Sequence, residues 1–165
     1  MIYDIKAIPT VYAGVRFRSR LEARWAAFFD LAGIKWDYEP FDLDGWAPDF
    51  MLRTDIGHIL VEVKPVDTDD YRETGDAFDK AFQYWSQHQV LLLGLGPIEK
   101  RDLLGVILDP PDGAKHDWLE VMDALMVRDS ESKWREAGNI VQWKAPRHAG
   151  GYHAQLSRTF KRSAA

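Results

Sequence analysis

Three charged residues in the first half of the chain have the types and spacing of a reactive group. Glu62 and Lys64 stand two residues apart in HILVEVK, residues 58–64. That run alternates as a β-strand does, so both side chains project from the same face. Asp49 follows Pro48 at the start of the preceding predicted strand. If the two strands pair as a hairpin, two carboxylates and one ammonium meet at a sheet edge.

This set of side chains suits chemistry that depends on a divalent metal ion. Carboxylate pairs bind Mg²⁺ well, because this hard cation prefers oxygen ligands and retains several waters. A bound metal lowers the pKa of its water and polarises a phosphoryl oxygen. Lys64 beside it would orient or deprotonate the attacking water and screen developing charge. The plainer alternative for Glu62 and Lys64 alone is an exposed ion pair.

Upstream of these residues, FRSRLEARWAAFF, residues 17–29, predicts a helix. Its apolar residues recur at helical spacing, so one face is expected to be buried. Ser19 is a good N-cap and Glu22 lies three residues on, which is a capping box. Gly33 is expected to end the helix. The sequence therefore leaves two roles open for Glu22, as a cap and as a member of the reactive group.

Three arginines surround the start of this helix, namely Arg18, Arg20 and Arg24. Cations are unfavourable there, because the N-terminus of a helix carries partial positive charge. They are therefore expected to contact an anion. A nucleic-acid phosphate is one such anion, since arginine binds it through two hydrogen bonds. The alternative is pairing within the protein, for example with Asp37 or Glu39.

The remaining pattern predicts an α/β sandwich with a mixed central sheet. Strands are expected at residues 36–43, 46–53, 58–64, 90–95 and 103–108, and a second helix carries the apolar stripe Phe78, Ala81, Phe82 and Trp85. Residues 110–113 read as a turn, 118–126 as helix or strand, 140–143 as a short strand and 152–161 as a terminal helix.

Length and composition suggest a single domain over residues 1–165. The chain has no cysteine, which excludes disulfides and thiol nucleophiles and fits a reducing cytoplasm. It shows no signal peptide and no apolar run long enough to cross a bilayer, so no membrane partner is expected.

The charges are unevenly distributed along the chain. Residues 1–36 hold six basic and three acidic residues, and residues 133–165 hold seven and one. Residues 37–132 hold eight basic and twenty-two acidic residues. One interpretation is that central carboxylates hold a metal while the basic ends hold a polyanion. The other is a solvated acidic surface with a basic tail.

The order of a helical acid, Pro-Asp, Glu-x-Lys and a second helix resembles the PD-(D/E)XK nuclease superfamily. The resemblance covers roughly residues 15–95, and FRSRLEARWA is similar to a segment of small phage-encoded members. It implies a restriction-endonuclease-like core with a mixed sheet flanked by helices. Residues 97–165 then form a C-terminal extension with a basic tail.

The resemblance also implies an activity and a role for each motif residue. The activity is that of a metal-dependent nuclease that hydrolyses phosphodiester bonds in DNA, with an endonuclease favoured over an exonuclease. It implies Mg²⁺ or Mn²⁺ held by Asp49, Glu62 and the Val63 carbonyl. Glu22 becomes a ligand to metal-bound water or to a second metal, and Lys64 becomes the residue that orients water. The implied location is the cytoplasm of a bacterium or of a phage-infected host cell.

Further residues are expected to complete the site and to bind DNA. Family members add a polar residue from the next helix, and here Gln83 or Lys80 is the candidate, with an exposed helix face as the alternative. The residues expected to contact nucleic acid are Arg18, Arg20, Arg24, Lys80, Arg147, Arg158, Lys161 and Arg162. The sequence leaves open branched or single-stranded DNA, RNA as substrate, and a homodimer. The alternative function is a catalytically silent nuclease-fold protein, such as a phage factor that binds nucleic acid or a host protein.

Overall fold

The computed structural model describes residues 7–69, 71–110 and 113–142 of the chain. Its centre is one five-stranded sheet with the strand order β3-β4-β5-β6-β7. The strands are β3 (Lys35–Tyr38), β4 (Phe50–Thr54), β5 (Gly57–Val63), β6 (Gln89–Leu93) and β7 (Val106–Ile107). The β5–β6 pair is parallel and the other three pairs are antiparallel. The predicted α/β class with a mixed central sheet is therefore confirmed.

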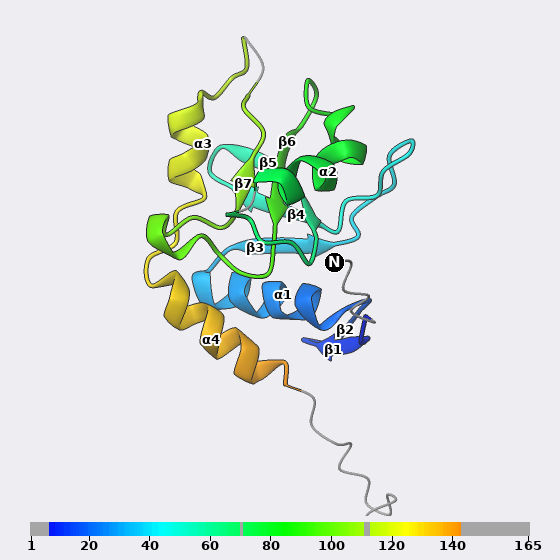
Figure 1. The fold of residues 1–165 in the computed structure, drawn as a ribbon, viewed down its shortest axis with the longest axis vertical. Helices are drawn as coiled ribbons and strands as arrows, with labels where there is room; N and C mark the ends of the chain where they lie inside the picture. The colour runs from blue at the N-terminus through cyan, green and yellow to red at the C-terminus, as the bar shows by residue number, and fades with distance from the viewer. Residues whose placement is uncertain (1–6, 70, 111–112, 143–165) are drawn as a thin grey trace, which may run out of the picture.

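Helices cover both faces of this sheet (Figure 1). The helices of the described residues are α1 (Arg20–Ala32), α2 (Tyr71–Phe82), α3 (Trp118–Ala124) and α4 (Ser130–Ile140), and a short 3₁₀ helix lies at Glu99–Arg101. α1 packs on one face and has α4 along its outer side, whereas α2 lies on the opposite face. α2 also makes the crossover that a parallel β5–β6 pair requires. A small hairpin of β1 (Thr10–Tyr12) and β2 (Val15–Phe17) adjoins α1.

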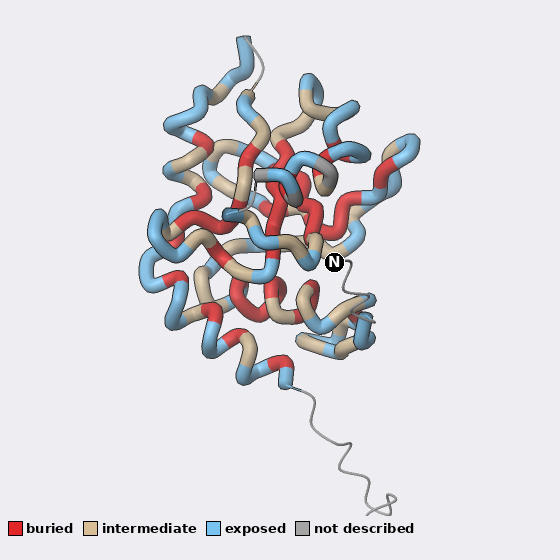
Figure 2. The backbone as a smooth tube through the Cα atoms, in the orientation of Figure 1, coloured by how far each residue is buried: buried red, intermediate tan, exposed pale blue. Residues whose placement is uncertain are grey.

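The residues of β5 divide between two hydrophobic layers. Ile59, Val61 and Val63 join the core under α1, and Leu60 joins the smaller core under α2. Figure 2 shows the buried residues concentrated along the central strands and the inner side of α1. The alternation predicted for this strand is thus confirmed, and it places Glu62 on the side of the sheet where α2 lies.

Both ends of α1 follow the sequence signals. The Ser19 hydroxyl accepts a hydrogen bond from the Glu22 amide at 3.1 Å, and Gly33 ends the helix with a left-handed φ of 71°. The capping box is incomplete among the described contacts. The Glu22 carboxylate accepts a hydrogen bond from the Ser19 hydroxyl at 2.9 Å instead of returning to the Ser19 amide.

The two strands before β5 are shorter than the sequence predicts. β3 ends at Tyr38, because Glu39 has a positive φ of 44° and Pro40 has no amide hydrogen to donate. β4 begins at Phe50, and upstream of it only an isolated bridge joins Leu43 to Trp46. The segment before β4 is therefore a loop, and Asp49 stands at the point where that loop enters the sheet.

Differences also occur after β5. α2 ends at Phe82, so Trp85 lies outside the helix, and β7 covers only two of the six residues predicted at 103–108. Residues 118–124 form a helix, α3, which begins with a complete capping box at Asp117 and Glu120. The strand predicted at 140–143 is wrong for residues 140–142, because residue 140 ends helix α4 and residues 141–142 form a turn and a bend, while residue 143 lies outside the described residues.

Part of the predicted C-terminal half lies outside the described residues. This holds for residues 111–112 of the predicted turn and for the predicted helix at 152–161. It also holds for four of the residues expected to bind nucleic acid, which are Arg147, Arg158, Lys161 and Arg162.

Candidate active site

The β4–β5 hairpin brings Asp49 beside Glu62. Phe50 pairs with Val61, and the Asp49 amide donates to the Val61 carbonyl at 2.9 Å. Both carboxylates are buried, with 4% of Asp49 and 6% of Glu62 exposed. The predicted meeting of these two side chains is therefore present, at the end of β5 that leads to α2.

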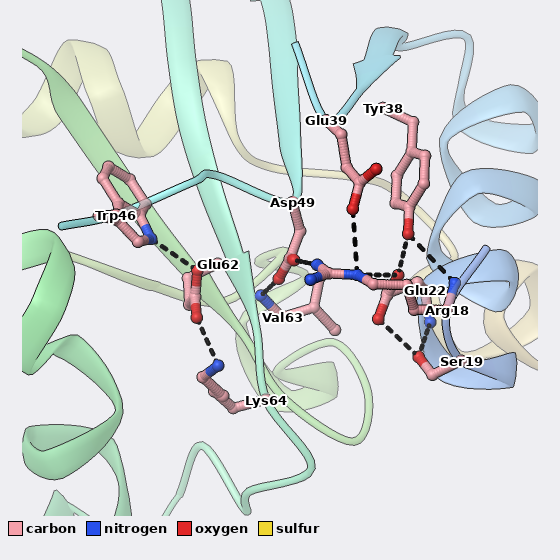
Figure 3. Close-up of polar contacts among 10 residues, drawn as sticks. All are labelled: Arg18, Ser19, Glu22, Tyr38, Glu39, Trp46, Asp49, Glu62, Val63 and Lys64. Carbon is pink, nitrogen blue, oxygen red and sulfur yellow. Dashed lines mark hydrogen bonds and ion pairs between the residues drawn. The ribbon is translucent and has the colours of Figure 1, made fainter. Parts of the chain in front are cut away.

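Each oxygen of the Asp49 carboxylate has a partner (Figure 3). Oδ2 accepts from the Val63 amide at 2.7 Å, and Oδ1 accepts a short hydrogen bond from the Arg18 guanidinium. Burial raises the pKa of Asp49 to about 7, and the charge of Glu62 adds to this rise against the opposing effects of the Val63 amide and Arg18. Burial and the neighbouring Glu62 therefore both disfavour the negative charge of Asp49.

Glu62 is fixed by two side chains that approach it from opposite sides. The Trp46 indole N–H donates to Oε2 at 2.7 Å, and the Lys64 ammonium lies 2.5 Å from Oε1. Lys64 keeps 43% of its side chain exposed, so it links the buried carboxylate to solvent. Sequence reasoning missed Trp46. The available signal was a tryptophan beside a turn, whose indole N–H needs an acceptor when buried.

Glu22 belongs to a second group of polar contacts. Its Oε2 accepts a 2.5 Å hydrogen bond from the Tyr38 hydroxyl, while Oε1 meets Ser19. Burial raises the pKa of Tyr38 to about 12, and its hydrogen bond to Glu22 adds to this rise. Arg18 Nε lies 3.8 Å from Glu22 Oε2, so Arg18 bridges the Glu22 group and Asp49.

Arg18 pairs with protein carboxylates, as the second interpretation of the arginines predicted. Besides Asp49 and Glu22, its Nε lies 3.1 Å from Glu39 Oε1. Burial alone would lower the pKa of Arg18, but the hydrogen bond to Tyr38 and the nearby carboxylates raise it above its ordinary value. Its side chain is nevertheless 58% exposed, so the guanidinium reaches buried groups from the surface.

An open cleft of ≈ 420 Å³ lies at the β4–β5 hairpin, over Asp49 and Glu62. Its lining includes Arg18, Asp49, Glu62, Lys64 and Lys80. Lys80 comes from α2, and therefore from the layer that faces Glu62. Buried carboxylates at the base of a cleft with cations around it can hold a small cation or receive a polyanion.

Glu22 faces an adjoining hollow of ≈ 350 Å³, whose lining also includes Arg20 and Lys64. Lys64 thus borders both hollows. Glu22 and the Asp49–Glu62 pair therefore line two separate hollows that share Lys64.

The donor set fits a magnesium or manganese ion held by two carboxylates. Among the described residues, no group of three or more Asp, Glu, His or Cys is placed to hold a metal. Mg²⁺ is usually bound by one or two carboxylates together with waters, so Asp49 and Glu62 are sufficient in number and type. Their mutual repulsion, which contributes to the raised pKa of Asp49, is the kind of strain that a divalent cation relieves.

The two candidates for an additional site residue, Gln83 and Lys80, have different surroundings in the structure. Gln83 follows the end of α2, and its amide donates to the Asp44 carbonyl at 3.0 Å, so it contacts the loop before Trp46. Lys80 instead lines the cleft.

The other two arginines near the start of α1 also differ from each other. Arg24 Nε and Nη2 both donate to the Trp134 carbonyl, at 3.1 and 2.8 Å, and the guanidinium lies 4.0 Å from the centre of the Trp134 ring. Arg24 therefore joins α1 to α4. Arg20 is exposed and has no hydrogen bond or ion pair with another described residue.

The raised pKa of Asp49 predicts a pH-dependent difference between the wild type and Asp49→Asn. The folded protein binds a proton on the Asp49 carboxyl more tightly than the unfolded chain does. The stability that this protonation contributes is therefore fully present below about pH 4 and is lost as the pH rises through 7. Without metal, Asp49→Asn should therefore gain stability relative to the wild type between pH 4 and 8, by up to about 4 kcal/mol.

Urea unfolding in EDTA at several pH values measures this gain. The exposed Asp55→Asn, in the turn between β4 and β5, is the matched control and should show no such trend. A difference between Asp49→Asn and the wild type that stays constant with pH would contradict the assignment.

In comparisons with known proteins, no family model, curated protein or solved structure matches the chain. Within the described ranges, no helix has the length and apolar character needed to cross a membrane.

Proposed function

We propose that this chain is a metal-dependent nuclease of the PD-(D/E)XK type that hydrolyses phosphodiester bonds in DNA. The observation that carries the proposal is the pair of buried carboxylates, Asp49 and Glu62, at the base of an open cleft with Lys64 against Glu62. The sheet of mixed direction between α1 and α2 also suits a restriction-endonuclease-like core. The proposed setting is the cytoplasm of a bacterium or a phage-infected cell.

The energetics favour a functional reason for this pair. Burying two like charges side by side is costly, and a buried ion pair contributes less to stability than well-packed apolar side chains would. A Mg²⁺ or Mn²⁺ held by Asp49 and Glu62, with the Val63 carbonyl as the third proposed ligand, would supply a Lewis acid and an acidified water. Trp46 fixes the orientation of Glu62 so that one oxygen faces Lys64.

The cations then take positions that suit a phosphodiester. Lys64 borders both hollows, where it can orient a water and stabilise charge that develops at phosphorus. Lys80 lines the cleft and Arg20 lines the hollow beside it, so both are proposed to contact backbone phosphates. In the proposal Glu22 acts through water or a second metal, since Ser19 and Tyr38 already hold its two oxygens.

One observation favours the second candidate, a silent nuclease-fold protein that binds nucleic acid or a host protein. Both oxygens of Asp49 and of Glu62 already have partners within the protein. A site of this kind can be stable without metal, as expected for a binding module.

Incubating the purified chain with linear, circular, single-stranded and branched DNA, and with RNA, tests the proposal. Each substrate is combined with Mg²⁺, Mn²⁺ or EDTA. Cleavage with metal and none with EDTA is the expected result, and cleavage of circular DNA would identify an endonuclease. Binding without cleavage under every condition would favour the silent protein. Light scattering of the same samples tests the proposed homodimer.

Arg20 and Arg24 should respond differently to loss of charge. Arg20→Gln is expected to flatten the dependence of log K on log salt for duplex DNA by roughly 0.9, because one phosphate contact is lost. Arg24→Gln should instead lower stability by about 1–3 kcal/mol, because it breaks two charged hydrogen bonds and a cation–π contact with Trp134. Fluorescence anisotropy and thermal melting measure the two effects. A changed salt slope for Arg24→Gln at unchanged stability would reverse the two assignments.

A further inference from the structure

The Arg18 guanidinium lies where positive charge is needed between three carboxylates. It contacts Asp49 and Glu39 directly and approaches Glu22, as Figure 3 shows. Asp49 is 4% exposed, so its charge has little solvent to stabilise it. Arg18 therefore serves as the counter-ion of Asp49 when no metal is bound.

A divalent cation that binds Asp49 needs a lone pair on one of two oxygens that each already accept a hydrogen bond. Each oxygen has a second lone pair, but a cation at Oδ1 would lie beside the Arg18 guanidinium, and the two positive charges repel each other. Oδ2 is held by the Val63 amide, which is part of β5 and cannot leave without disrupting the strand. Oδ1 is held by Arg18. This residue lies in the short segment between β2 and α1, and its side chain is 58% exposed. Arg18 is therefore the partner that can move, and its departure frees Oδ1.

A guanidinium released from Asp49 would remain near the cleft, because Arg18 lines it together with Lys64 and Lys80. Its other ionic partner outside the Glu22 group, Glu39, has half of its side chain exposed, and such an exposed pair is weak. The planar guanidinium fork matches the oxygens of a phosphate group. A DNA phosphate entering the cleft thus offers Arg18 a better partner than Glu39.

We propose, on the basis of the proposed function, that Arg18 is an internal counter-ion which a divalent cation displaces from Asp49 and which then binds a substrate phosphate. Two consequences follow. Arg18 competes with the metal in the free protein, and the metal makes Arg18 available to DNA. Metal and DNA binding therefore favour each other through one side chain.

The first test is a titration of the metal-free protein with Mn²⁺, with free Mn²⁺ measured by electron paramagnetic resonance. Arg18→Gln and Arg18→Met should each bind Mn²⁺ about tenfold more tightly than the wild type, because no internal cation has to be displaced. The matched control is Arg16→Gln, which removes the same charge from an exposed position two residues away in β2. Circular dichroism verifies that the variants are folded.

The second test measures the salt dependence of binding to a fluorescent duplex. It is carried out in EDTA and in Ca²⁺, at a Ca²⁺ concentration that displaces Mn²⁺ in the first titration. In EDTA the wild type and Arg18→Gln should have the same slope of log K against log salt. In Ca²⁺ the wild-type slope should be steeper than that of Arg18→Gln by roughly 0.9, which corresponds to one additional phosphate contact.

The outcomes separate this inference from the proposed function. If neither wild type nor variants bind Mn²⁺, the metal-dependent function itself fails. If the wild type binds Mn²⁺ but Arg18→Gln, Arg18→Met and Arg16→Gln all behave like it, the displacement is overturned while the proposed function stands. A slope difference of the same size in EDTA would show that Arg18 binds phosphate without being released by metal, which also overturns the inference.

Discussion

The Glu62→Gln variant is expected to cleave DNA at least about 10²–10³-fold more slowly than the wild type at saturating Mg²⁺, the loss typical of removing one preorganised electrostatic group. Glutamine keeps an acceptor oxygen for Trp46 and nearly the same shape. It removes the charge that would hold the cation and that now attracts Lys64 at 2.5 Å. The loss should therefore appear in turnover while the fold is retained.

Single-turnover rates, together with thermal melting, measure this effect. The matched control is Glu136→Gln, which neutralises an exposed carboxylate on α4 and should leave the rate unchanged. A wild-type rate for Glu62→Gln at saturating Mg²⁺ would remove Glu62 from the metal site.

Lys64→Met is expected to lower kcat by about 10²–10⁴-fold, the contribution typical of a positioned proton-transfer group. An ammonium is not a metal ligand, and it now competes for Glu62 Oε1, so Mn²⁺ affinity should stay at the wild-type value or become tighter. Cleavage kinetics combined with isothermal titration of Mn²⁺ distinguish the two effects.

Lys35→Met, an exposed lysine at the start of β3, is the control for loss of charge and should retain both properties. A large loss of Mn²⁺ affinity in Lys64→Met would identify the Glu62–Lys64 contact as a structural ion pair that shapes the site.

The central part of the fold follows closely from sequence pattern. The run at 58–64 alternates and the run at 90–95 is continuously apolar, and the structure has strands there at 57–63 and 89–93, paired in parallel. Gly33 ends α1 because its left-handed φ is readily adopted only without a side chain. Such signals are local, so they can be read without the tertiary structure.

Helix α4 could not be predicted in this way. Its buried apolar residues are Trp134, Ala137 and Val141, and the intervening residues are polar or glycine except for the exposed Ile140. Short helices of this kind owe their stability to packing, here against α1. Gly138 adds to the difficulty: glycine weakens a helix pattern, and a Cβ there would lie 2.8 Å from the Arg24 guanidinium, which would have to shift.

In the candidate site, too, some contacts follow from local sequence pattern and others depend on the tertiary structure. The meeting of Asp49 and Glu62 follows from alternation and one hairpin, so it could be foreseen. The contacts of Arg18 with Asp49 and of Trp46 with Glu62 could not, because both begin in segments outside the regular sheet strands. Their paths depend on local backbone features such as the positive φ of Gly45 beside Trp46.

The separation of contacting residues along the chain also bears on the order in which the molecule assembles. Asp49 meets the Val63 amide across fourteen residues, whereas Arg24 meets Trp134 across 110. Closing the longer loop costs about 2 kcal/mol more in chain entropy. The hairpin that carries both carboxylates can therefore form early during folding, while α4 must wait for most of the chain. Local opening at α4 would therefore act first on α1, against which α4 packs and which carries Glu22 and Arg20, rather than on the hairpin that carries the two carboxylates.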